Sequence, residues 1–180
     1  MKTDDKLVAR IGPENTLPDP LGSPLPRLVL SATNGITVDL AERASSDILV
    51  LHPVALPLDC LIPQPLDNAF QIKRSIATLL AFNELCDELE SVGISVFGIS
   101  VQSPEMQRLT AASLELKFPL LSDKHAALAL ALKLPLIRNG RSPRCPLLVL
   151  EARMGRIVRH INPLMEPDGL LETMRRFLIS

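Results

Sequence analysis

The three cysteines, Cys60, Cys86 and Cys145, are the residues of this sequence best suited to redox chemistry. A cysteine thiolate attacks peroxides and disulfides, whereas a thiol buried among apolar side chains is inert. Three is an odd number, and the opening segment MKTDDKLVARIGPEN carries charges where a secretion signal needs an apolar stretch, so we do not expect structural disulfides. The cysteines are therefore either buried thiols or redox-active ones.

Other common kinds of chemical site have no signature in the sequence. His52, His125 and His160 are too scattered to predict a metal site, and there is no CxxC, HExxH or glycine-rich phosphate loop. We therefore expect neither a metal nor another cofactor.

The length and composition fit one aliphatic domain. A chain of 180 residues with 47% hydrophobic and 3% aromatic residues builds its core from Leu, Ile, Val and Ala. A net charge of -1 provides no positive field to attract nucleic acid or anionic lipid. The apolar stretch AALALALKLPLI is interrupted by Lys133, well short of a membrane span. We expect a cytoplasmic protein with neither a nucleic acid nor a membrane partner.

The N-terminal residues 1–26 are predicted to form an extended arm, followed by one domain over residues 27–180. Five prolines and two glycines between residues 12 and 26 oppose both a helix and ladder hydrogen bonds.

The rest of the chain alternates between strand and helix patterns. Apolar runs, bounded by turn residues such as Asn34-Gly35 and Met154-Gly155, predict strands, and apolar residues at helical spacing predict helices. The expected strands are 27–31, 36–40, 47–53, 94–100, 118–123, 146–150 and 156–161, and the expected helices are 67–92, one beginning at Pro104, 124–134 and 166–177. This order predicts an α/β, thioredoxin-like three-layer fold with a mixed central sheet and flanking helices.

Three segments of the sequence, FNELCDELESVGISVFGIS, FPLLSD and GRIVRHINPLMEPDGLLETMRRFL, resemble the peroxiredoxin superfamily, especially its thiol peroxidase and bacterioferritin-comigratory branches. The resemblance runs from about Arg27 to the end. It implies the peroxiredoxin variant of the fold, often as a homodimer. It also implies reduction of hydrogen peroxide or organic hydroperoxides by a cysteine thiolate, which a thioredoxin-like protein or a small thiol would then regenerate.

Members of the family hold the reactive cysteine in a P-x-x-x-T/S-x-x-C pattern after the central strand. Pro53 and Cys60 keep this spacing, so Cys60 resembles the reactive cysteine and Pro53 the proline that shields it. Position 57, where the family has Thr or Ser, is a proline with neither a hydroxyl nor an N–H to orient a peroxide.

A second alignment gives a different residue. The family usually has a Phe seven residues after the reactive cysteine, and Phe82 resembles that Phe, which places Ser75 at the reactive position. The two alignments differ by 75 − 60 = 15 residues. If the additional residues follow Cys60, the thiol is kept; if they precede Ser75, a hydroxyl has replaced it and no thiolate chemistry is left.

The family's active-site arginine precedes the strand at 146–150, so Arg144 is its candidate and Arg141 the fallback. Thioredoxin folds commonly have a cis-proline at the same place, and the Cys145-Pro146 step resembles it. On that resemblance Cys145 would approach Cys60 and could resolve its sulfenic acid as a disulfide.

The usual resolving cysteines of the family are missing. Thr110 stands at the position used by thiol peroxidases, and Pro65 at the position used by the other branch. Cys86, between Leu85 and Leu89 on the longest predicted helix, is better suited to core packing.

Three functional hypotheses follow. The first is a peroxidase that uses Cys60, Pro53 and Arg144. The second is a binding or interaction module that has the fold without the activity. The third and least favoured is a thiol–disulfide oxidoreductase, which would need an unusual pair of thiols because the sequence lacks a CxxC motif.

Overall fold

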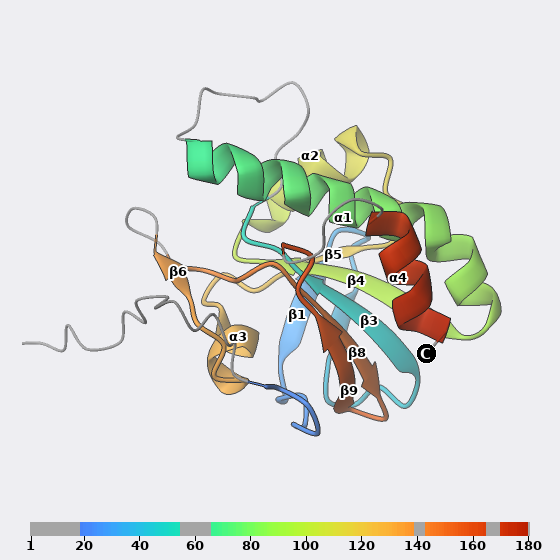
Figure 1. The fold of residues 1–180 in the computed structure, drawn as a ribbon. Coiled ribbons are helices and arrows are strands. Elements are labelled where there is room, and N and C mark those ends of the chain that lie inside the picture. The colour runs from blue at the N-terminus through green and yellow to red at the C-terminus, as the bar shows by residue number, and fades with distance from the viewer. Residues whose placement is uncertain (1–18, 55–65, 139–142, 165–169, 180) are drawn as a thin grey trace, which may run out of the picture.

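The computed structural model describes residues 19–54, 66–138, 143–164 and 170–179 (Figure 1). Its strands and helices follow the predicted alternation. They are β1 (Val29–Ala32), β2 (Thr37–Asp39), β3 (Ser46–Leu51), α1 (Leu66–Ser91), β4 (Ile94–Ser100), α2 (Pro104–Ser113), β5 (Leu120–Ser122), α3 (Ala127–Ala131), β6 (Ile137–Arg138), β7 (Pro143–Arg144), β8 (Leu148–Arg153), β9 (Arg156–Ile161) and α4 (Leu170–Ile179).

Seven of these strands form one mixed sheet in the order β2-β1-β5-β4-β3-β8-β9. The central strand β3 pairs in parallel with β4 and antiparallel with β8. Figure 1 shows α1, α2 and α4 over one face of the sheet and α3 on the other. The predicted α/β, thioredoxin-like fold with a mixed sheet and flanking helices is confirmed.

The sheet has a hydrophobic core on each face because β3 is apolar at every position after Asp47. Ile48 and Val50 pack with α1 and α4, while Leu49 and Leu51 pack with α3 on the opposite face. A strand with this unbroken apolar pattern is stable only when both faces are covered. The end of β3 is therefore held from both sides, which fixes the starting point of the segment that follows.

The predicted helix at 124–134 is shorter in the structure. α3 covers only Ala127–Ala131. The Asp123 carboxylate accepts hydrogen bonds from the backbone N–H of Ala127 (2.8 Å) and Leu128 (2.9 Å), which sets the start of the helix. Lys133 has a positive φ of 57°, which ends the helical conformation. The sequence pattern also missed the small β6–β7 hairpin, whose two strands are each only two residues long.

Residues 19–26 of the predicted N-terminal arm run alongside β9. Contrary to the expectation that prolines exclude ladder hydrogen bonds, Pro24 forms an antiparallel bridge with Arg156, because the bonds are made by the residues on either side of the proline. Residues 1–18 lie outside the described residues, and the division into an arm at 1–26 and a domain at 27–180 stays a prediction.

Candidate functional site

The candidate site lies at the carboxyl edge of the parallel strands β3, β4 and β5. His52 and Pro53 follow β3 at this edge. Because Leu51 pairs with Leu148 in the antiparallel β3–β8 ladder, the segment before β8, which includes Arg144 and Cys145, reaches the same edge. The topology therefore brings three of the four predicted site residues to one edge of the sheet. In open α/β sheets this is the edge where sites form.

The fourth predicted site residue, Cys60, lies outside the described residues, as does position 57. Pro53 is buried at the end of the central strand. α1 is described from Leu66, and the segment between Val54 and Leu66 lies outside the described residues.

Ser75, the residue given by the second alignment, is inside a helix and not at its start. It lies 75 − 66 = 9 residues after the first residue of α1. Its side chain is buried, and its hydroxyl donates a hydrogen bond to the Gln71 carbonyl at 2.7 Å. The free N–H groups that make a helix start favourable for an anion are therefore distant from Ser75.

The two cysteines in the described part of the chain are both buried. Burial raises the pKa of Cys86 above the usual thiol value, with further contributions from the negative charges of Glu90 and Asp87. Burial also raises the pKa of Cys145, to about 12, with a smaller contribution from Asp123. Both thiols are protonated at neutral pH, so neither is a good nucleophile. Cys86 is part of the core beneath α1, as predicted.

The prediction of a cis bond between Cys145 and Pro146 is wrong. The described residues contain no cis peptide bond. Trans is the lower-energy form of an X–Pro bond, and residues 145–147 run into β8 without a turn that would need the cis form. The role of Cys145 as a resolving cysteine stays a prediction, and it would require the buried thiol to become accessible.

Arg144 is half-buried on β7, opposite Ile137 of β6. Within the described segments its guanidinium has no ion-pair partner. The alternative candidate, Arg141, lies outside the described residues.

The most unusual polar group at this edge, the side chain of His52, was not predicted from the sequence. It is fully buried, and neither ring nitrogen has a hydrogen-bond partner among the described residues. Burial lowers its pKa from 6.5 to about 4, so the ring is neutral at pH 7. The available signal was a histidine ending the otherwise apolar run DILVLHP.

Gly98 of β4 has no side chain, and neighbouring side chains fill the space that one would take. A Cβ at this position would lie 2.3 Å from Leu120 Cδ2, 3.2 Å from Leu79 Cδ2 and 3.7 Å from His52 Nε2. Because Leu120 is fully buried, its side chain has little room to move away. The absence of a side chain at Gly98 is therefore a packing requirement of this edge.

We expect Gly98→Ala to destabilise the protein by about 1–3 kcal/mol, the usual cost of overpacking a core. Urea unfolding at pH 7 measures this cost. As a control, the same substitution in a Leu120→Ala background should cost less, because the clashing methyl groups are gone. Equal costs in the two backgrounds would contradict the packing argument.

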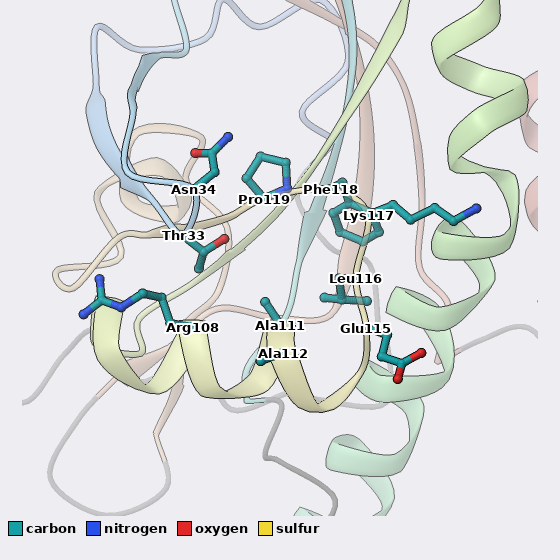
Figure 2. A pocket seen from close by; sticks show the side chains of 10 residues that line it. All are labelled: Thr33, Asn34, Arg108, Ala111, Ala112, Glu115, Leu116, Lys117, Phe118 and Pro119. Atoms are coloured by element: carbon teal, nitrogen blue, oxygen red, sulfur yellow. The ribbon is translucent and has the colours of Figure 1, made fainter.

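A surface pocket of about 340 Å³ lies elsewhere, between the β1–β2 turn and the end of α2 (Figure 2). Figure 2 shows Ala111 and Ala112 on α2 facing Thr33 and Pro119 across it. The pocket borders the start of β5, and its lining does not include His52, Pro53, Arg144 or Cys145. It is not part of the candidate site.

Two further findings concern the class of protein. No helix among the described residues is long and apolar enough to cross a membrane. No curated protein sequence matches the chain significantly.

Several solved structures with the same fold are peroxiredoxins. A cysteine-to-serine mutant of PrxQ from Xylella fastidiosa is 18% identical, with a TM-score of 0.67 over 88% of this chain and 95% of that one. Peroxidoxin BcpB from Mycobacterium tuberculosis is 18% identical, with a TM-score of 0.64 over 87% and 96%. The bacterioferritin comigratory protein of Xanthomonas campestris, described for its alkyl peroxide reduction activity, is 21% identical, with a TM-score of 0.65 over 86% and 94%. The fold is thus thioredoxin-like, of the peroxiredoxin type.

A family model gives the relationship in sequence. Residues 72–151 match the AhpC/TSA family, from α1 to β8. Together with the fold, this match supports the resemblance to the peroxiredoxin superfamily found in the sequence. The matched stretch includes Arg144 and Cys145 and begins 72 − 60 = 12 residues after Cys60.

Proposed function

We propose that this protein is a thiol-dependent peroxidase in which Cys60 is the nucleophile. The Cys60 thiolate attacks the terminal oxygen of a hydroperoxide, the S–O bond forms as the O–O bond breaks, and the leaving alkoxide or hydroxide takes up a proton. The cysteine becomes a sulfenic acid and the peroxide becomes an alcohol or water. The match of residues 72–151 to the AhpC/TSA family and the peroxiredoxin-type fold support this class of reaction.

The observation that carries the assignment is the burial of the other two thiols. Cys86 and Cys145 both have pKa values raised by burial, so neither forms a thiolate readily at neutral pH. Of the three cysteines, Cys60 is the one that follows Pro53 at the family spacing, after the end of the central strand.

The remaining assignments follow from this choice. Pro53 would shield the thiolate, and the guanidinium of Arg144 would stabilise its charge. A thioredoxin-like protein or a small thiol would reduce the sulfenic acid, since the family's usual resolving positions hold Thr110 and Pro65. The homodimer and the cytoplasmic location expected from the sequence also stay predictions.

One observation favours a second function, that of a binding module with the peroxiredoxin fold but without the activity. The match to the AhpC/TSA family starts at residue 72, and so leaves out Pro53 and Cys60. Position 57 also lacks the hydroxyl that family members use to orient the peroxide. These features are compatible with loss of the reaction and retention of the fold.

Peroxide consumption by the wild type and by single Cys→Ser variants at 60, 86 and 145 separates the two functions. We expect Cys60→Ser to reduce consumption to the level of the buffer, because a hydroxyl does not form the nucleophile. Cys86→Ser should keep the wild-type rate, and circular dichroism should show that each variant is folded. Full activity in Cys60→Ser would exclude the proposed nucleophile, and an inactive wild type with every thiol reductant tried would favour the binding module.

A further inference from the structure

The surface pocket between the β1–β2 turn and the end of α2 has walls that hydrogen bonds hold in place. On one side, Thr33 N–H donates to the Leu120 carbonyl (2.9 Å), and Thr33 Oγ1 accepts from Leu120 N–H (3.0 Å). On the other side, the Asn83 amide of α1 donates to the Glu115 carbonyl (3.1 Å) and accepts from Lys117 N–H (2.7 Å). Sites for small molecules are usually formed before the ligand binds, and this pocket meets that condition.

The backbone after α2 turns the chain back across the end of the pocket. Glu115 has a positive φ of 50°, and Leu116 N–H donates to the Ala111 carbonyl at 2.9 Å. Together they end the helix in a tight turn. Figure 2 shows the Leu116 side chain pointing from this turn into the space above α2. The turn therefore closes one end of the pocket with an apolar side chain.

The floor of the pocket is apolar and consists of small side chains. Ala111 and Ala112 face Pro119 across the space, and larger residues at these two helix positions would fill it (Figure 2). Its volume of about 340 Å³ is at the lower end of the range of about 300–1,000 Å³ for small-molecule sites. The pocket therefore fits a small ligand with an apolar body.

The charges of the lining are arranged unequally. Arg108, at the left-hand end in Figure 2, is exposed and has no ion-pair partner in the described part of the chain. The other lining cation, Lys117, extends away to α1, where it pairs with Asp87 (2.5 Å). Glu115 lies at the end opposite Arg108. An anionic group is thus attracted to the Arg108 end and repelled from the other, and a guanidinium can bind a carboxylate through two parallel hydrogen bonds.

We propose that this pocket binds a small monocarboxylate with a short aliphatic chain. The carboxylate pairs with Arg108, and the chain lies over Ala111 and Ala112 against Pro119. Arg108 and Ala112 are four residues apart on α2, a rise of about 6 Å, so a chain of a few carbons reaches the apolar floor. The proposal does not depend on peroxidase activity.

The test uses hexanoate as the probe and the full-length, isotope-labelled protein, followed by two-dimensional amide NMR. Two further compounds separate the two parts of the ligand: acetate has the charge without the chain, and hexanamide has the chain without the charge. We expect saturable shifts with hexanoate, centred on the amide signals of Asn34, Ala111 and Ala112. Acetate and hexanamide should each bind at least about tenfold more weakly, because each lacks one of the two interactions.

Three variants complete the test. Arg108→Gln should weaken hexanoate binding by about tenfold or more, whereas the matched control Arg175→Gln, at an exposed arginine of α4, should keep the wild-type affinity. Ala112→Phe should fill the pocket and abolish binding, with circular dichroism to show that it is folded. Three results would overturn the proposal: no saturable shifts with hexanoate, shifts centred on another part of the molecule, or an unchanged affinity in Arg108→Gln.

Discussion

Replacing His52 with leucine should remove much of the protein's sensitivity to mild acid. The buried ring is neutral in the folded protein, with a pKa of about 4, and titrates at about 6.5 in the unfolded chain. Between these two values the unfolded chain binds the proton and the folded protein does not. The wild type should therefore be fully stabilised above pH 6.5 and lose stability as the pH falls toward 4.

The size of this effect follows from the shift. A difference of 6.5 − 4 = 2.5 pKa units, at about 1.36 kcal/mol each, corresponds to about 3 kcal/mol. Urea unfolding at pH 7 and at pH 4 gives the free energy of unfolding of each protein. Between these two pH values, the wild type should lose about 3 kcal/mol more than His52→Leu. His125→Leu, which removes an exposed histidine, is the matched control and should not reproduce the effect of His52→Leu. An equal loss of stability in His52→Leu and the wild type would contradict the assignment.

The second large effect concerns Glu151, a buried carboxylate in the middle of β8. It accepts hydrogen bonds from Arg153 Nε at 2.8 Å and from the half-buried Arg159. Arg159 also donates to the Leu178 carbonyl at the end of α4. Glu151→Ala removes the buried carboxylate that Arg153 and Arg159 both contact. We expect a loss of about 3–5 kcal/mol in the free energy of unfolding, measured with urea at pH 7.

Two controls distinguish the buried pair from general damage to the strand. Arg153 is 56% exposed, so Arg153→Ala should cost at most about 1 kcal/mol. The double variant Glu151→Met/Arg159→Met should be more stable than Glu151→Ala, because apolar side chains replace both charges. A Glu151→Ala protein as stable as Arg153→Ala would show that the buried pair contributes little.

Much of the fold followed from local patterns in the sequence. β4 was predicted at residues 94–100, the range it occupies, and α1 was predicted within one residue at each end. Ser103 caps α2 and Pro104 is its first residue, as predicted. These features depend on residues close together in the chain. The shortening of α3 depends on a side-chain cap and a positive φ, which the apolar pattern at 124–134 does not encode.

The site was less predictable, because its arrangement depends on contacts between distant segments. The register of β3 and β8 brings Arg144 to the edge that holds Pro53, as the family resemblance implied. The buried ring of His52 has no such signal, because its burial depends on the three-dimensional packing around it, including Gly98 of β4. The Cys145-Pro146 step shows the opposite error, in which a feature common to the fold was carried over to a bond that is trans here.

The most direct test of the proposed chemistry is to locate the oxidised sulfur. The reduced protein would be treated with one equivalent of hydrogen peroxide in the presence of dimedone, which traps sulfenic acids, and its peptides would be analysed by mass spectrometry. The account predicts a dimedone adduct on Cys60 and none on Cys86, whose pKa burial raises, or on Cys145, where burial raises it to about 12. An unmodified Cys60, with the peroxide left unconsumed or another cysteine labelled, would contradict it.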